Sequence, residues 1–262
     1  MSDTEGSADS ENEATGQNFK ESHELIRLQK PVVIDSERGR HVDKNTISPR
    51  FYNCFNYSLL PSKQVDVHLA VGVTSANKGE GKTIVAANLA VSLALASQSE
   101  TVLVDLNLRS PRIHSIFGTR LVPGVCGALT DPTIQVSQTQ IKHLYVLPAG
   151  NVSGGLLFEE RIAGRERKDA QDGGKSSLSL ESVLEFRDVL YSLKKEFEFV
   201  IVDMPSIHEP RVPSLISHQL DGVLVVVDAN KTKHEDIERM FRHINEQRIL
   251  GFVMNRATED LE

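Results

Sequence analysis

One segment of the sequence, residues 71–83, restricts the fold more than any other. It reads Val-Gly-Val-Thr-Ser-Ala-Asn-Lys-Gly-Glu-Gly-Lys-Thr and joins an apolar, β-prone run to a helical run that starts at Ile84. This order of strand, glycine-rich loop, Gly-Lys-Thr and helix is typical of a phosphate-binding loop, because backbone N–H groups and the helix N-terminus converge on phosphate oxygens. The strict motif has Gly six residues before the lysine, where this chain has Ala76. The alternative is a glycine-rich turn that binds no ligand.

Two side chains of this loop have expected roles at a nucleotide. Lys82 is expected to reach the β- and γ-phosphates, and the hydroxyl of Thr83 is expected to bind Mg²⁺. The sequence therefore predicts a nucleotide site, with Lys82 also as a catalytic residue. Its binding residues in this stretch are Asn77, Lys78, Gly79, Glu80, Gly81, Lys82, Thr83 and Ile84.

The composition argues against several other classes of protein. The formal net charge of -7 over 262 residues speaks against a general nucleic-acid surface. The two cysteines, Cys54 and Cys126, show no metal or redox spacing, which fits a reducing compartment. The N-terminus carries no basic or apolar segment typical of a signal peptide, and no apolar run approaches the roughly 20 residues that span a bilayer. We therefore expect a cytoplasmic protein that reaches the inner membrane only through a partner.

The chain divides into an acidic N-terminal tail and one α/β domain. Residues 1–47 are expected to be largely disordered, since the first part of this segment is acidic and has little to bury. Within it, residues 31–34 are expected to form a short extended patch that could dock on a surface. Residues 48–262 alternate apolar strands with amphipathic helices, which predicts a mostly parallel, doubly wound sheet with helices on both faces. The expected strands are 68–74, 101–106, 143–147, 199–203, 222–227 and 249–254. The expected helices are 50–60, 83–97, 111–117, 180–193 and one capped by Thr232 with Glu235, and residues 163–177 are expected to form a mobile loop.

Two aspartates end strands that should lie close to the phosphate loop. Asp203 follows the run Phe-Val-Ile-Val, and Asp105 follows Val-Leu-Val in the strand after the loop's helix. In a right-handed βαβ unit the two strand ends are neighbours, and Mg²⁺ takes oxygen ligands from one or two carboxylates. We therefore predict Thr83, Asp105 and Asp203 as metal ligands, with both aspartates also catalytic. The alternative for each is an aspartate that caps the turn after its strand.

Several segments together resemble bacterial tyrosine kinases of exopolysaccharide and capsule synthesis, which belong to the wider class of P-loop ATPases that includes partition and septum-site proteins. The resembling segments are residues 75–90, 102–111, 144–150, 199–205, 221–227 and 250–256. The resemblance covers roughly residues 68–257 and implies ATP with Mg²⁺ as cofactors. It also implies a membrane-bound polysaccharide chain-length or co-polymerase protein as partner, possible self-association, and Asn255 close to the adenine.

The chain departs from this family at four places, one of which is the long loop before the second acidic strand, which lacks the family's Asn-Pro. The second acidic motif of the family is Asp-x-Asp-x-Arg, but here Asn107 replaces its second aspartate. Loss of a general base typically lowers the rate roughly 10²–10⁴-fold. The loss is smaller if Asp105, and not residue 107, is the base. The family's first helix carries Glu-x-x-Arg-x-x-Arg for ring assembly, where this chain has Tyr52, Phe55 and Ser58. The family also ends in a tyrosine cluster, whereas no tyrosine follows Tyr191 here.

These departures favour an ATP-binding, tyrosine-kinase-like protein with reduced or lost autophosphorylation. An active tyrosine kinase is the first alternative, with Tyr52, Tyr57 or a partner protein as substrate. A partition or septum-site ATPase is the second, although Asn77 stands where that class has a second lysine. A pure interaction protein that has lost ATP binding is the third.

Overall fold

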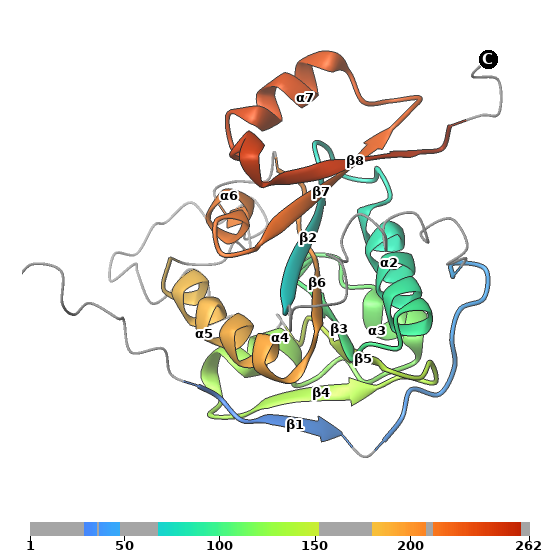
Figure 1. Ribbon diagram of the computed structural model, residues 1–262, viewed down its shortest axis with the longest axis vertical. Helices are drawn as coiled ribbons and strands as arrows, with labels where there is room; N and C mark the ends of the chain where they lie inside the picture. The colour runs from blue at the N-terminus through green and yellow to red at the C-terminus, as the bar shows by residue number, and fades with distance from the viewer. Residues whose placement is uncertain (1–28, 36, 48–67, 152–179, 208–211, 258–262) are drawn as a thin grey trace, which may run out of the picture.

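The computed structural model describes residues 29–35, 37–47, 68–151, 180–207 and 212–257. Its strands form one eight-stranded sheet in the order β1-β4-β5-β3-β6-β2-β7-β8 (Figure 1). All neighbours are parallel except β4 and β5, so β1 and β4 run against the other strands. The strands are β1 (Val32–Asp35), β2 (Leu69–Ser75), β3 (Thr101–Asp105), β4 (Ile134–Gln138), β5 (Leu144–Leu147), β6 (Phe199–Asp203), β7 (Gly222–Asp228) and β8 (Ile249–Asn255).

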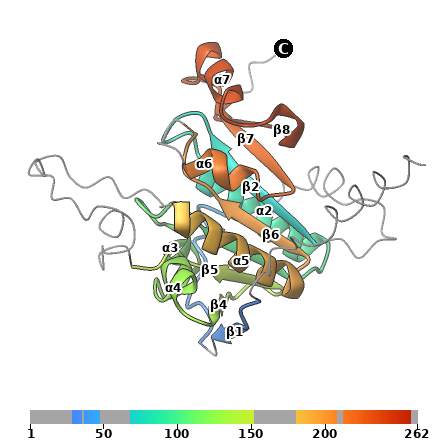
Figure 2. The ribbon, with the colours of Figure 1, turned by 90° about the vertical axis from the view of Figure 1, so that its left-hand side faces the viewer.

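Helices cover both faces of this sheet (Figure 2). One face carries α2 (Lys82–Ala96) and α3 (Ile113–Phe117). The other face carries α4 (Gly124–Thr130), α5 (Leu180–Glu196), α6 (Val212–Ser217) and α7 (His234–Phe241), and a 3-10 turn, η3 (Glu246–Arg248), precedes β8. This arrangement confirms the predicted α/β class with a mostly parallel, doubly wound sheet.

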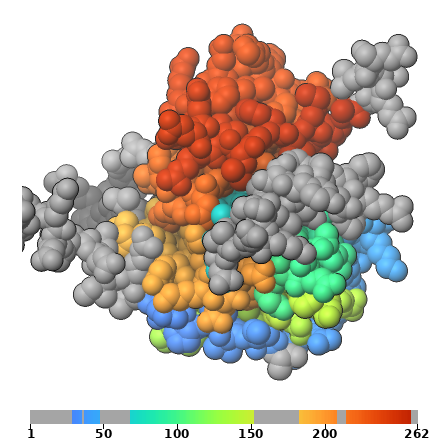
Figure 3. Space-filling view, viewed as in Figure 1, coloured from blue at the N-terminus to red at the C-terminus, as the bar shows by residue number. Residues whose placement is uncertain are grey.

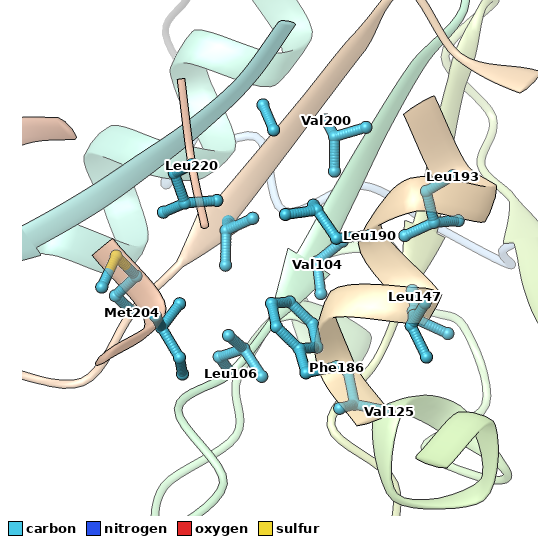
Figure 4. Packing of buried hydrophobic residues seen from close by; sticks show 14 of the residues in the cluster. Val104, Leu106, Val125, Leu147, Phe186, Leu190, Leu193, Val200, Met204 and Leu220 are labelled. Carbon is cyan, nitrogen blue, oxygen red and sulfur yellow. The ribbon is translucent and has the colours of Figure 1, made fainter. Parts of the chain in front are cut away.

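The central strands are mainly apolar up to a buried aspartate at the end of each, because they lie between two helix layers. Every residue of β3, β6 and β7 is buried. On one face, Phe186 and Leu190 of α5 project toward Val104 of β3 (Figure 4). On the other face, fully buried Ala86 and Ala90 let α2 approach the sheet closely. The sheet is therefore a rigid base for the loops at its carboxyl edge.

Part of the segment that we assigned to the disordered tail belongs to the fold. β1 pairs with β4, from Val32 opposite Ile134 to Asp35 opposite Ser137. The following residues run along α3 and α2, where the backbone N–H of Asp43 donates to the carbonyl of Ile116 at 2.9 Å. The predicted boundary at residue 48 is therefore too late in the chain. A strand of four residues gives almost no periodic signal, and its partner strand is distant in the sequence.

The six predicted strands are all present, each within one residue of its expected limits. The sequence analysis missed β4, which has only five residues, α4, whose two glycines lower its helix propensity, and α6, which has only six residues. The predicted Thr232 cap is wrong, because α7 begins at His234 after Lys233. The predicted helix 50–60 and loop 163–177 lie outside the described residues.

Candidate nucleotide site

The carboxyl ends of three neighbouring strands form the centre of the candidate site. β3, β6 and β2 lie side by side, and their register places Asp105 opposite Asp203 and Asp203 opposite Val73. The predicted phosphate loop leaves β2 after Ser75 and enters α2 at Lys82. The two aspartates and the loop therefore meet at one edge of the sheet, as the sequence predicted.

Two glycines give the loop its path. Gly79 has φ +88° and Gly81 has φ +98°, a left-handed backbone region that L side chains rarely adopt. Gly81 is also the residue before the first turn of α2, and a Cβ built there would lie 2.1 Å from Nδ2 of Asn255. A side chain at Gly81 would therefore strain the backbone and displace the asparagine.

Thr83 and Lys82 connect the loop to the second acidic strand. The hydroxyl of Thr83 donates to Oδ2 of Asp203 at 2.7 Å. Lys82 is 5% exposed, and its charge only partly opposes the rise in pKa that burial causes at Asp105 and Asp203. A lysine, a hydroxyl and two carboxylates thus face the same small volume, which is the chemistry that a Mg²⁺-bound phosphate chain requires.

The two carboxyl groups are difficult to ionise together. Two effects raise the pKa of Asp203 to about 8: burial first, and then the charge of the neighbouring Asp105 carboxylate. Burial also raises the pKa of Asp105 to about 6, although hydrogen bonds from backbone N–H groups oppose this. A bound divalent cation would relieve both effects, because it compensates the charge of two buried carboxylates.

Asp105 combines its place at the site with a structural role. Its Oδ1 accepts from the backbone N–H of Asn107 at 3.0 Å, and its Oδ2 accepts from those of Arg112 and Ile113 at 3.1 and 3.2 Å. These bonds fix the turn that leads into α3. The capping role that we kept as the alternative for a strand-end aspartate is therefore present at Asp105.

Asp203 differs, because one of its oxygens has no partner. Among the described residues, Oδ1 of Asp203 is buried and accepts no hydrogen bond. An orphaned buried carboxylate oxygen beside a threonine hydroxyl fits Mg²⁺ or one of its waters. Within the same residues, no group of three or more His, Cys, Asp or Glu side chains is arranged to hold a metal. Mg²⁺ here would therefore be held by Thr83, one or two aspartates, waters and the phosphates.

A pocket of about 480 Å³ opens beside these groups. Of the predicted residues, Lys78, Gly79, Gly81, Lys82, Thr83 and Ile84 line it, together with Asn107. Sequence reasoning did not assign the other lining residues to the nucleotide site: Asp43, Thr46, Ser110, Arg112, Ser115, Ile116 and Arg256. Asp43 and Thr46 come from the segment assigned to the tail, so no local motif could have identified them.

The remaining predicted residues support the loop from behind. Asn77, Glu80 and Asn255 are not among the lining residues. The backbone N–H of Asn77 donates to Oε2 of Glu80 at 3.0 Å, and the amide of Asn255 donates to the carbonyl of Glu80 at 2.9 Å. Glu80 is only 2% exposed. The structure thus joins these three residues to one another, at the back of the loop.

Two curated tyrosine-protein kinases align with this chain over most of their length, and a longer transport protein aligns over a part of its own. The tyrosine-protein kinase CpsD of Streptococcus pneumoniae serotype 4 is 26% identical over 79% of this chain and 83% of its own. The tyrosine-protein kinase YwqD of Bacillus subtilis is 24% identical over 86% of this chain and 91% of its own. The succinoglycan biosynthesis transport protein ExoP of Rhizobium meliloti is 25% identical over 71% of this chain, which corresponds to 22% of ExoP. No family model matches the sequence.

Solved structures share the fold. The chimerical protein CapA2B2 has a TM-score of 0.62 at 21% identity, over 88% of this chain and 96% of its own. The kinase domain of VpsO has a TM-score of 0.60 at 24% identity, over 80% of this chain and 96% of its own. The cell division ATPase MinD of Pyrococcus furiosus has a TM-score of 0.50 at 22% identity, over 72% of each chain. By sequence this chain resembles the bacterial tyrosine kinases, and its fold is the one that their kinase domains share with MinD.

Proposed function

We propose that this protein binds ATP with Mg²⁺ and acts as a tyrosine-kinase-like component of exopolysaccharide or capsule synthesis or export, with reduced or lost autophosphorylation. The observation that carries the proposal is the contact between Thr83 and Asp203, because it places a loop hydroxyl and a half-partnered buried carboxylate together beside Lys82. These groups can bind a Mg²⁺–nucleotide, whereas a glycine-rich turn that binds no ligand does not require them.

Each residue has a distinct role in this proposal. Lys82 compensates charge on the β- and γ-phosphates, and the backbone N–H groups of the loop bind their oxygens. Thr83 and Asp203 hold Mg²⁺, with Asp105 directly or through water. Asn255 supports the loop from the side where the resemblance places the adenine, through its bond to the carbonyl of Glu80.

Two observations support weak phosphotransfer. Asn107 lines the pocket with a neutral amide, which cannot accept the proton of a tyrosine hydroxyl. Asp105 would have to replace it, but three backbone N–H groups already donate to its two oxygens and stabilise its carboxylate. Burial raises the pKa of Asp105, but these bonds engage both of its oxygens and its side chain does not line the pocket. The proposal therefore assigns Asp105 to positioning and to the metal.

An active tyrosine kinase and a partition or septum-site ATPase each require residues that can be looked for in the structure. An active tyrosine kinase needs an acceptor, and the described tyrosines pack against other residues: Tyr145 against Phe197 and Tyr191 under Lys195. Tyr52 and Tyr57 lie outside the described residues. A partition or septum-site ATPase uses a second loop lysine, whereas the Asn77 amide here donates to Glu80 and Asp236 within the same chain. Both observations favour an ATP-binding, tyrosine-kinase-like protein with reduced or lost autophosphorylation.

The partner is proposed from the architecture of one relative. The region similar to this chain makes up 22% of ExoP, a succinoglycan biosynthesis transport protein. We infer that the partner is a membrane-bound polysaccharide chain-length or co-polymerase protein, in line with the transport role that the name of ExoP states. Within the residues that the structure describes, no helix is long and apolar enough to cross a membrane. The proposal therefore places this protein at the inner membrane through its partner.

Calorimetric titration of ATP with Mg²⁺ tests the nucleotide site. The wild-type protein should bind, and Lys82→Ala should abolish binding because the phosphate charge is no longer compensated. Lys142→Ala removes the same charge from an exposed position that does not line the pocket and is the matched control. Equal affinities of the wild type and Lys82→Ala would rule out this assignment.

A further inference from the structure

Arg112 brings a positive charge to the candidate nucleotide pocket from outside the phosphate loop. The cationic side chains that line the pocket are Lys78, Lys82, Arg112 and Arg256. Lys78 and Lys82 belong to the loop segment, and Arg256 follows the last residue of β8. Of these four, only Arg112 comes from the turn between β3 and α3. The phosphate-loop motif therefore does not account for its place at the pocket.

Hydrogen bonds fix the backbone of Arg112 next to the candidate metal ligands. Its N–H donates to Oδ2 of Asp105 at 3.1 Å. Its carbonyl accepts from the N–H groups of Ser115 and Ile116, both at 3.1 Å. Asp105 in turn lies opposite Asp203 in the register of β3 and β6. The side chain of Arg112 therefore starts one hydrogen bond away from a carboxyl group of the proposed Mg²⁺ site.

The surrounding residues do not compensate the charge of Arg112. Within the part of the chain that the structure describes, its exposed side chain forms no hydrogen bond and no ion pair. Asp43, an acidic residue that lines the same pocket, instead accepts from the hydroxyl of Thr46 at 2.7 Å. Arg256 differs, because its Nη1 is paired with the buried carboxylate of Asp228. The guanidinium group of Arg112 can therefore pair with an anionic ligand in the pocket.

The strand order indicates which phosphate Arg112 faces. Along the carboxyl edge, β3 and β6 lie on one side of β2, and β7 and β8 lie on the other. Figure 3 shows α7 and β8 at one end of the molecule and β1 at the opposite end. The proposed Mg²⁺ ligands Asp105 and Asp203 end β3 and β6. Because Mg²⁺ contacts the β- and γ-phosphates, the terminal phosphate lies on the same side of the loop as Arg112.

We propose that the guanidinium group of Arg112 binds the γ-phosphate and makes the site distinguish ATP from ADP. The inference rests on the proposed ATP site and adds a specificity-determining residue to it. A guanidinium group can donate two parallel hydrogen bonds to one phosphate. ADP lacks the phosphate that would accept them, so the affinity gained through Arg112 is available to ATP and not to ADP.

Calorimetry with nucleotides that differ in the γ-phosphate tests this role. The affinities for the non-hydrolysable analogue AMP-PNP and for ADP, each with Mg²⁺, would be measured in the wild type and in Arg112→Ala. The variant should lose about tenfold in affinity for AMP-PNP, the lower limit for a hydrogen bond to a charged group. Its affinity for ADP should stay unchanged, which loss of the fold or damage to the phosphate loop would not allow.

Two further variants separate the γ-phosphate contact from a general effect of charge. Arg112→Lys keeps the charge but loses the planar pair of donors, so its affinity for AMP-PNP should lie between those of the wild type and Arg112→Ala. Arg242→Ala removes an exposed arginine that does not line the pocket and should change neither affinity.

Two results in Arg112→Ala would overturn the inference while leaving the ATP site in place. One is an equal loss of affinity for AMP-PNP and for ADP, and the other is no loss for AMP-PNP. Failure of the wild type to bind either nucleotide would instead overturn the proposed function, and this inference with it.

Discussion

The hydroxyl of Thr83 donates a 2.7 Å hydrogen bond to Oδ2 of Asp203, between the first turn of α2 and the end of β6. The other carboxylate oxygen of Asp203 is buried without a partner among the described residues. Since Mg²⁺ is bound through oxygen ligands of this kind, the pair fits the metal site that we propose.

Two substitutions at Thr83 distinguish the effect of its hydroxyl on ATP affinity from the effect of its side-chain shape. Thr83→Val has nearly the same shape without the hydroxyl, and it should lower the Mg²⁺-dependent part of ATP affinity by roughly 10–100-fold, the size of a lost hydrogen bond to a charged group. Thr83→Ser keeps the hydroxyl and should bind within a few-fold of the wild type. Titrations with Mg²⁺ and with EDTA measure this part directly. A Thr83→Val protein as Mg²⁺-dependent as the wild type would exclude the hydroxyl as a ligand.

The raised carboxyl pKa values predict opposite pH effects on folding and on binding. The pKa is about 8 for Asp203 and about 6 for Asp105, whereas an unfolded chain has carboxyl pKa values near 3.9. The folded protein therefore binds protons that the unfolded chain has released. Through this pair, the free protein should lose stability as the pH rises from about 4 to about 8. Affinity for Mg²⁺–ATP should rise over the same range, because binding requires ionised carboxylates.

Thermal unfolding without nucleotide and calorimetry with Mg²⁺–ATP, both at pH 5 to 8, measure the two effects. Asp203→Asn removes the group with the higher pKa and should flatten the stability profile. The assignment fails if the wild type, relative to Asp203→Asn, becomes more stable as the pH rises through this range.

Two glycines of the loop allow a matched stability test. Alanine at Gly79 meets only the left-handed backbone, which costs about 1–2 kcal/mol, because nothing lies within 4 Å of a Cβ built there. Alanine at Gly81 meets the same backbone cost and also the amide of Asn255. Urea unfolding should therefore show a larger loss of unfolding free energy for Gly81→Ala than for Gly79→Ala. Equal losses would mean that Asn255 moves away without cost.

The absent ring-contact charges predict a small assembly. Tyr52, Phe55 and Ser58 stand where the resembling kinases carry a glutamate and two arginines. Without these charges, light scattering should find no large ring in the absence of nucleotide. Titration of ATP with Mg²⁺ during the measurement shows whether assembly depends on the nucleotide. A large ring that forms without ATP would indicate that Tyr52 and Phe55 replace the charged contact.

The sequence predicted the fold well where the signal was local. Each buried central strand reads as an apolar run, so β2, β3, β6 and β7 lie within one residue of their expected limits. The phosphate loop was recognisable because its glycines and Lys82 stand at fixed spacing. Residues 31–34 were predicted to be an extended patch that could dock on a surface, but not a strand of the sheet, because β1 joins the sheet through its pairing with β4, which is distant in the sequence.

The parts of the site that depend on tertiary contacts were not predictable in the same way. Asp43 and Thr46 line the pocket because their segment runs along α2 and α3, and no motif marks that path. The capping bonds of Asp105 depend on the turn before α3. Arg256 was within reach of sequence reasoning, since it directly follows Asn255, but its ion pair with Asp228 required the pairing of β7 with β8.

The central claim is that the site binds ATP but transfers its phosphate poorly, because Asn107 replaces an acid. It is tested most directly by transfer of labelled phosphate from ATP to an acidic, tyrosine-containing copolymer and to the protein itself. The wild type and Asn107→Asp would be compared with and without the cytosolic segment of the co-polymerase partner. We expect little labelling by the wild type and at least about a hundredfold more by Asn107→Asp, the lower limit for a restored general base. Strong tyrosine phosphorylation by the wild type would contradict the account.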